Sequence, residues 1–156
     1  MKYEPNFHVV LYEPEIPQNT GSIGRTCVAT AAKLWLIKPL GFSMEERMLR
    51  RAGLDYWPHL EWEIAENWDD ALRRLPDRRP WYFSKKATQL YTDVAFERGD
   101  VLVFGCETQG LPEAMIEANL DRCLRIPIRE QVRSLNLSNA VAVILFEAMR
   151  QTNLNV

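Results

Sequence analysis

Short runs of apolar residues alternate along this chain with longer segments in which apolar residues recur every third or fourth position. An unbroken apolar run is typical of a strand in a parallel sheet, because helices cover both faces of such a sheet. Spacing of three or four residues is typical of a helix with one buried face. The predicted strands are residues 7–12, 34–37, 60–64, 81–84, 101–106 and 123–128, and the predicted helices are residues 22–33, 44–52, 68–75, 112–119 and 138–152.

This order of elements predicts an α/β fold, with a parallel sheet flanked by helices on both faces. Asn19 or Thr20 is expected to cap the first helix, and Ser138 the last. No repeat or linker divides the chain, so we expect one domain over residues 1–156, with residues 1–6 and 153–156 as loose tails. Ligands of such folds bind beyond the carboxyl ends of the strands, which is where the conspicuous polar motifs of this sequence fall.

Composition narrows the choice of function. The formal net charge of −2 over 156 residues provides no general positive field that would attract nucleic acid. Arginine supplies 14 of the 19 cations, however, and its planar guanidinium suits local binding of phosphate. Three cysteines without a Cys-x-x-Cys pair predict neither a disulfide framework nor a zinc site, and we expect no metal. No apolar stretch approaches ~18 residues, so we expect no membrane contact and a cytoplasmic location.

The first motif, residues 19–25 (NTGSIGR), follows the first predicted strand. A helix that begins there would offer free N–H groups to an anion, with Arg25 one turn further along. A capped helix with a solvated arginine explains the same spacing equally well.

The second motif, residues 104–112 (FGCETQGLP), closes the predicted strand 101–106. It places Glu107 between Gly105 and Gly110, and glycine lets a backbone approach a ligand closely. A Rossmann-type oxidoreductase would instead carry a G-x-G-x-x-G fingerprint after the first strand, where this chain has EPEIPQNTG. A tight turn with positive φ is the alternative, but a carboxylate between two turn glycines favours a functional site.

The third motif, residues 133–140 (RSLNLSNA), lies between the last predicted strand and the last helix. Ser138 as a cap would be structural. Ser134 and Asn136 are not needed for capping and could bind a ligand, although small polar residues are also ordinary loop material.

Together the three motifs resemble the SPOUT superfamily of RNA methyltransferases. The resemblance is closest to the SpoU-like ribose 2′-O-methylases, and among them to the small enzymes that modify the wobble nucleotide of tRNA. It extends from Phe7 to Gln151 through VLYEPEIPQNTGSIGR, RRAGLDYW, FGCETQGLP, RIPI and RSLNLSNAVAVILFEAMRQ. The tryptophan-rich residues 57–68 have no counterpart in the family pattern.

The resemblance implies a SPOUT-type fold with a C-terminal deep trefoil knot that binds S-adenosylmethionine, without a metal. The implied cofactor-binding residues are Phe83, Ser84, Gly105, Glu107, Gly110, Ile126, Ile128, Ser134, Leu135 and Asn136. The implied catalytic residues are Arg25, Asn19, Glu107, Ser134 and Asn136.

The implied reaction is methylation of the ribose 2′-hydroxyl of nucleotide 34 in the anticodon loop of tRNA. Arg25 would be the main catalytic residue, either as a general base or as an electrostatic clamp on the developing alkoxide and the adjacent phosphate. We favour the clamp, because a free guanidinium titrates above about 12. Methylation of another tRNA or rRNA nucleotide, and a non-enzymatic RNA-binding module, remain as alternatives.

The implied partners are the tRNA anticodon stem-loop and a second copy of the chain. Apolar residues surround most of the last helix, which suits burial on two sides and a homodimer through that helix. In a monomer, residues such as Phe146 or Met149 would face water.

Overall fold

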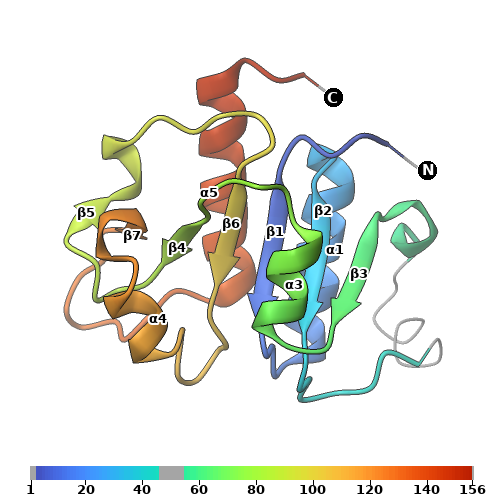
Figure 1. Cartoon of the computed structure of the whole chain (residues 1–156), viewed down its shortest axis with the longest axis horizontal. Coiled ribbons are helices and arrows are strands. Elements are labelled where there is room, and N and C mark those ends of the chain that lie inside the picture. Colours follow the sequence, from blue (N-terminus) through green and yellow to red (C-terminus); the bar gives the residue numbers. More distant parts are fainter. Residues whose placement is uncertain (1–2, 46–54, 156) are drawn as a thin grey trace.

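The computed structural model describes residues 3–45 and 55–155, so most of the predicted helix 44–52 lies outside the described residues. Within this part of the chain, seven strands form one sheet in the order β3-β2-β1-β6-β4-β7-β5, and every pairing is parallel (Figure 1). The strands are β1 (His8–Tyr12), β2 (Lys33–Ile37), β3 (Trp62–Ala65), β4 (Trp81–Phe83), β5 (Gln89–Leu90), β6 (Val101–Phe104) and β7 (Cys123–Arg125).

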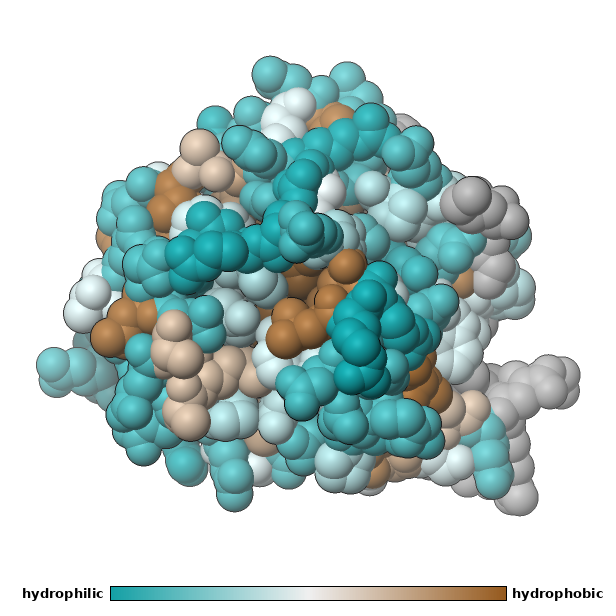
Figure 2. Space-filling view, viewed as in Figure 1, coloured by the Kyte–Doolittle hydropathy of each residue, from teal (hydrophilic) through white to brown (hydrophobic). Residues whose placement is uncertain are grey.

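Helices cover both faces of the sheet, which confirms the predicted α/β fold (Figure 1). Helices α1 (Pro17–Thr30) and α5 (Leu137–Thr152) pack together on one face, and α3 (Trp68–Arg74) and α4 (Glu113–Glu117) lie on the other. Side chains alternate along β1, so that Val9 and Leu11 join the core under α1 and α5 while Val10 joins the opposite core. Figure 2 shows that the face with α3 and α4 is largely hydrophilic, with small hydrophobic patches.

Short 3₁₀ helices complete the described elements: η1 (Trp57–His59), η2 (Tyr91–Asp93) and η3 (Leu120–Arg122). No helix among the described residues is long and apolar enough to span a membrane. Residues of the expected N-terminal tail bond to the fold, because the Asn6 backbone N–H donates to the Ala31 carbonyl and the Tyr3 hydroxyl donates to the Ala32 carbonyl.

Two predicted helix caps are wrong. Helix α1 begins at Pro17, and its N-cap residue Ile16 provides no side-chain hydrogen bond. Proline fits the first turn because that position lacks an intrahelical N–H partner in any case, and Asn19 and Thr20 therefore lie inside the helix. Helix α5 is capped by Asn136, whose Oδ1 accepts from the backbone N–H of Ser138, rather than by Ser138 itself. Helix α3 is capped by Asn67, whose side chain accepts from the Asp70 N–H.

Helix α5 buries one apolar face within its own chain. Ile144 and Leu145 are fully buried, and Met149 is only 7% exposed, so the expectation that Met149 faces water is wrong. Phe146 and Val143 are 56% and 38% exposed, respectively, and they form an apolar strip on the outer side of the helix.

Candidate functional site

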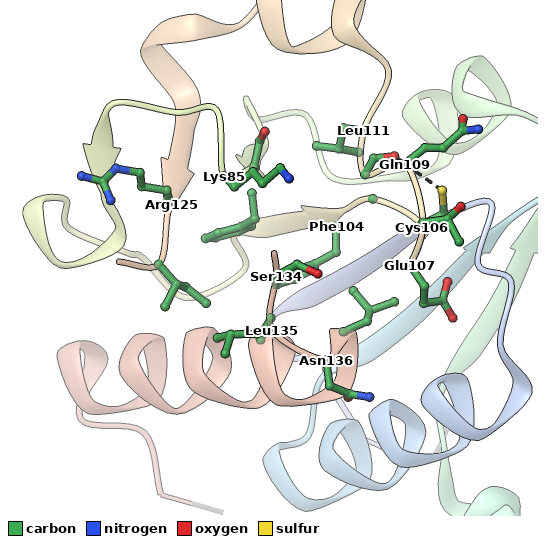
Figure 3. Close-up of a pocket in the computed structure, with 18 of the residues that line it drawn as sticks. Lys85, Phe104, Cys106, Glu107, Gln109, Leu111, Arg125, Ser134, Leu135 and Asn136 are labelled. Atoms are coloured by element: carbon green, nitrogen blue, oxygen red, sulfur yellow. Dashed lines mark hydrogen bonds between the residues drawn. The ribbon is translucent and has the colours of Figure 1, made fainter. Parts of the chain in front are cut away.

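A cavity of about 750 Å³ opens at the carboxyl edge of β4, β6 and β7, close to the first turn of α1 and the start of α5 (Figure 3). Its walls come from the segments after β4, β6 and β7, which the sequence separates widely. Apolar side chains form much of the lining, and Phe83 and Phe104 stack on each other with ring centroids 4.7 Å apart. A largely apolar cavity with a few polar groups is typical of a site for a small organic ligand.

Glu107 connects the segment after β6 to the start of α1. Its carboxylate accepts hydrogen bonds from the backbone N–H groups of Glu15 and Ile16, at 2.9 and 2.7 Å. It also accepts from the Asn19 side-chain amide at 3.2 Å. A helix N-terminus has unpaired N–H groups and a positive dipole end, and a carboxylate satisfies both. Glu107 therefore takes the place of the N-terminal cap that Ile16 cannot provide.

A second carboxylate completes this connection in the opposite direction. Glu15 accepts hydrogen bonds from the backbone N–H and the hydroxyl of Thr108, at 3.0 and 2.7 Å. These bonds hold the pKa of the Glu15 carboxyl below its ordinary value. The loop before α1 and the loop after β6 thus each bind a carboxylate of the other.

The third motif joins the same network through Asn136. Its side-chain amide donates to Asn19 Oδ1 at 3.0 Å, while its own oxygen caps α5. Asn19 is 7% exposed and bonds to both Glu107 and Asn136. The structure therefore brings residues of all three motifs into one chain of hydrogen bonds at the edge of the cavity.

The two glycines of the second motif serve different purposes. A Cβ atom on Gly105 would lie 2.1 Å from the backbone carbon of Gly110, so glycine is needed there because the loop folds back on itself. A short antiparallel bridge, with the Gly110 N–H donating to the Cys106 carbonyl at 3.0 Å, closes this loop. Gly110 has φ of +68° and open space where a Cβ would lie. Access of a ligand to the backbone, the reason expected from the sequence, is therefore not what requires glycine at position 105.

All ten residues predicted to bind the cofactor line this cavity. Four of the five predicted catalytic residues, Asn19, Glu107, Ser134 and Asn136, line it too. Arg25 does not line the cavity, and it lies exposed on α1, about one and two-thirds turns beyond Asn19. Their functional roles remain predictions, but the structure gathers every predicted residue except Arg25 around one cavity.

Arg25 lies beside the aromatic residues that follow the undescribed segment. The positive charge of Arg25 acts on the hydroxyl of Tyr56, whose pKa burial nonetheless raises to about 12. That hydroxyl donates to the Gly21 carbonyl. Trp57 packs so closely on Gly24 that a Cβ there would lie 2.7 Å from its ring. One tryptophan of the unmatched stretch 57–68 therefore supports the helix that carries Arg25.

Cys106 is the cysteine that lines the cavity. Its thiol donates to the Gly110 carbonyl at 3.7 Å, and burial raises its pKa. Cys27 and Cys123 are buried, and the three are free thiols. Among residues 3–45 and 55–155, no group of three His, Cys, Asp or Glu side chains is arranged to hold a metal ion.

Sequence reasoning missed several residues of the site. Glu15 and Thr108 form the reciprocal carboxylate contact, and Lys85 lines the cavity (Figure 3). The position of Glu15 in a turn between two prolines was the available signal, because a carboxylate held in a rigid turn after a strand has a defined direction.

Comparison with known proteins gives consistent matches. The model of the SpoU rRNA Methylase family matches residues 6–146. The tRNA (cytidine(34)-2′-O)-methyltransferase of Methylovorus glucosotrophus is 47% identical over 146 residues, which cover 93% of this chain and 95% of that protein.

Two solved structures extend the comparison. A structure from work on the 2-OH methylation of C/U34 on tRNA has a TM-score of 0.87 and 44% identity, over 93% of this chain and 95% of that chain. The SpoU methyltransferase AviRb from Streptomyces viridochromogenes, in complex with the cofactor AdoMet, has a TM-score of 0.78 and 25% identity. That match covers 96% of this chain and 59% of AviRb.

Proposed function

The chain belongs to the SpoU rRNA Methylase family, and on this basis we propose that it methylates the ribose 2′-hydroxyl of nucleotide 34 in tRNA, with S-adenosylmethionine as methyl donor. The resemblance drawn from the three motifs is thereby confirmed at the level of the family. The observation that carries the proposal is the network Glu107–Asn19–Asn136, which joins the three motifs at the edge of one cavity. A relative that shares the reaction on nucleotide 34 is 47% identical over nearly the whole chain.

The cavity fits the proposed methyl donor in size and in chemistry. Drug-sized ligands occupy cavities of about 300–1,000 Å³, and this one has about 750 Å³. Phe83, Ile126 and Leu135 offer apolar surface for an adenine ring, and the loop from Gly105 to Gly110 offers backbone groups. When bound, the donor supplies a methyl group already activated by its sulfonium charge. The chain therefore has to orient the ribose, exclude water and assist loss of the hydroxyl proton.

The hydrogen-bonded network positions the residues that orient the ribose, and Arg25 stabilises the negative charge that develops on the ribose oxygen. Glu107 is already occupied by three donors, so it acts through α1 and Asn19. Ser134, exposed on the segment that leads to α5, is free to contact the ribose. We assign Arg25 the role of clamp on the developing alkoxide and its phosphate. Because Arg25 lies outside the cavity lining, the RNA must extend from the cavity over α1, or a second copy must supply the arginine.

The exposed strip of Phe146 and Val143 supports a homodimer through α5. Helix α1, with Arg25, packs beside α5 on the same face of the sheet. We also propose that the C-terminal segment forms the deep trefoil knot of SPOUT methyltransferases, and that the protein acts in the cytoplasm, where it would meet tRNA.

Calorimetry and mapping of methylated nucleotides test this function. The purified protein should bind S-adenosylmethionine or S-adenosylhomocysteine equally well with and without a chelator. Mass spectrometry should find that tRNA from cells lacking the protein has lost 2′-O-methylation at nucleotide 34 alone. Loss at another tRNA or rRNA position would move the activity to that nucleotide, and binding of NADH instead of S-adenosylmethionine would overturn the assignment.

Variants of Arg25 test its role. Arg25→Ala should retain cofactor affinity and lose methyl transfer by orders of magnitude, because the clamp acts in the transition state. Arg25→Lys should be similarly inactive if the planar guanidinium matters. A mixture of Arg25→Ala and Asn136→Ala subunits that regains activity would show that the arginine acts across the dimer interface.

A further inference from the structure

Three of the six described cations without an acidic partner line the cavity. In residues 3–45 and 55–155, most Lys and Arg side chains lie within 4.0 Å of a carboxylate. The paired cations are Lys33, Lys38, Arg73, Arg74, Arg78, Arg79, Lys86, Arg98 and Arg150. The described cations without such a pair are Arg25, Lys85, Arg122, Arg125, Arg129 and Arg133.

Arg122 differs from the others because its guanidinium contacts a backbone carbonyl and an aromatic ring of the protein. It donates to the Arg79 carbonyl at 2.9 Å and lies 3.5 Å from the centroid of the Trp81 ring. Arg122 is therefore occupied within the protein. Lys85, which comes from the loop after β4, shares the cavity lining with Arg125 and Arg133.

We propose that Lys85, Arg125, Arg129 and Arg133, which we call the basic rim, bind the phosphodiester backbone of the RNA segment that carries the methylated nucleotide. Lys85, Arg125 and Arg133 line the cavity, and Arg129 lies in the same segment as Arg133, where both are exposed. Figure 3 shows Lys85 and Arg125 on the side of the cavity away from Glu107 and Asn136. This inference rests on the proposed function for the identity of the RNA.

The chemistry of the basic rim favours phosphate over other partners. Three of its members are arginines, which bind phosphate oxygens through two parallel N–H groups. Few carboxylates are free to pair with the rim. Glu107 lines the same cavity, but its carboxylate accepts from Glu15, Ile16 and Asn19. Glu113 pairs with Lys86 at 3.8 Å, and Glu130 is the acidic residue between Arg129 and Arg133. In a chain with a net charge of −2, leaving these cations unpaired at one cavity creates a local positive surface. Phosphate contacts of this kind fix the register of the RNA, and the cavity can then select the nucleotide.

The salt dependence of tRNA affinity measures these contacts. Each cation bound to a phosphate of single-stranded RNA contributes about 0.7 to the slope of log K against log salt. The double variant Arg129→Ala/Arg133→Ala should therefore lower the slope by about 1.4 and weaken binding at 0.15 M salt by about 15-fold. Lys85→Ala alone should lower the slope by about 0.7 and the affinity by about 4-fold.

Two controls accompany this measurement. Arg73→Ala removes an exposed arginine of α3 that pairs with Asp70, and it should leave the slope unchanged. Arg129→Lys keeps the charge and should retain the slope. If the unmodified protein methylates tRNA but the double variant keeps the full slope, the basic rim is wrong and the proposed function stands. If the protein binds no S-adenosylmethionine but the double variant has the reduced slope, the rim stands and the proposed function fails.

Discussion

Replacing Glu107 by alanine should disrupt the hydrogen-bonded network that positions α1 beside the cavity. The substitution removes the acceptor of two backbone N–H groups and of the Asn19 amide. It also removes the negative charge at the N-terminus of α1. The Ile16 N–H is accessible to water, which can replace part of the lost bonding, whereas Asn19 is buried.

The size of the effect follows from these contacts. Loss of a helix N-cap costs about 1 kcal/mol, and loss of a favourable charge at a helix terminus costs about 0.3–1 kcal/mol. The lost bond to buried Asn19 brings the total to about 2 kcal/mol. For a domain of this length, that corresponds to a fall in Tm of about 4–8 °C. The rate of methyl transfer should also fall, and by more than the loss of folded protein explains, because α1 carries both Asn19 and Arg25.

Urea unfolding and single-turnover methylation of tRNA, measured on the same preparations, provide the assay. Glu107→Gln keeps one acceptor oxygen and should lose less stability than Glu107→Ala. Glu117→Ala, on the exposed side of α4, is the matched control and should behave as the unmodified protein. Unchanged unfolding midpoint and unchanged methylation in Glu107→Ala would refute the idea that this carboxylate positions α1.

Three further predictions concern other parts of the molecule. Gly105→Ala should destabilise the protein more than Gly110→Ala, because the new Cβ at position 105 would lie 2.1 Å from backbone. The positive φ of Gly110 should cost Gly110→Ala about 1–2 kcal/mol and Gly110→Asn less. Thermal unfolding compares the three variants. Burial, with help from the charges of Lys33 and Arg78, lowers the pKa of His8 from 6.5 to about 4, so the unfolded chain takes up a proton that the folded protein excludes. The free energy of unfolding should therefore fall by up to about 3 kcal/mol as the pH drops from 6.5 to 4, and His8→Gln should lack this part of the pH dependence. Phe146→Glu should give a monomer in sedimentation experiments, and a fully active unmodified monomer at micromolar concentration would contradict the proposed dimer.

The strands were predictable because their sequences obey a simple physical rule. Strand β6 is apolar and buried at every position, and β1 at its three inner positions, so both stand out from their surroundings. The edge strand β5 was missed because it has two residues, Gln89 and Leu90, and pairs on one side with β7. Its position depends on a neighbour 35 residues later in the chain, which no local pattern reveals.

The composition of the candidate site was predictable, but its internal connections were not. Each motif follows a strand, and parallel strands bring their carboxyl ends to one edge, so a shared cavity could be expected. The caps were misassigned for a related reason. Local sequence identifies side chains that can cap their own helix, such as Thr20, but α1 is capped by Glu107, which is 91 residues from Ile16 along the chain.

The connection between Glu107 and Asn136 requires an amide side chain at position 19. Backbone N–H groups at the start of α5 bind the oxygen of Asn136, so the nitrogen of Asn136 must point toward Asn19. Asn19 therefore presents its oxygen to Asn136 and its nitrogen to the Glu107 carboxylate. Aspartate at this position would face Glu107 with a second negative charge, and leucine would leave both partners unsatisfied beside a buried group. An amide is the side chain of this size that accepts on one side and donates on the other, so the orientation of α5 and of the loop after β6 is transmitted to α1 through one buried residue.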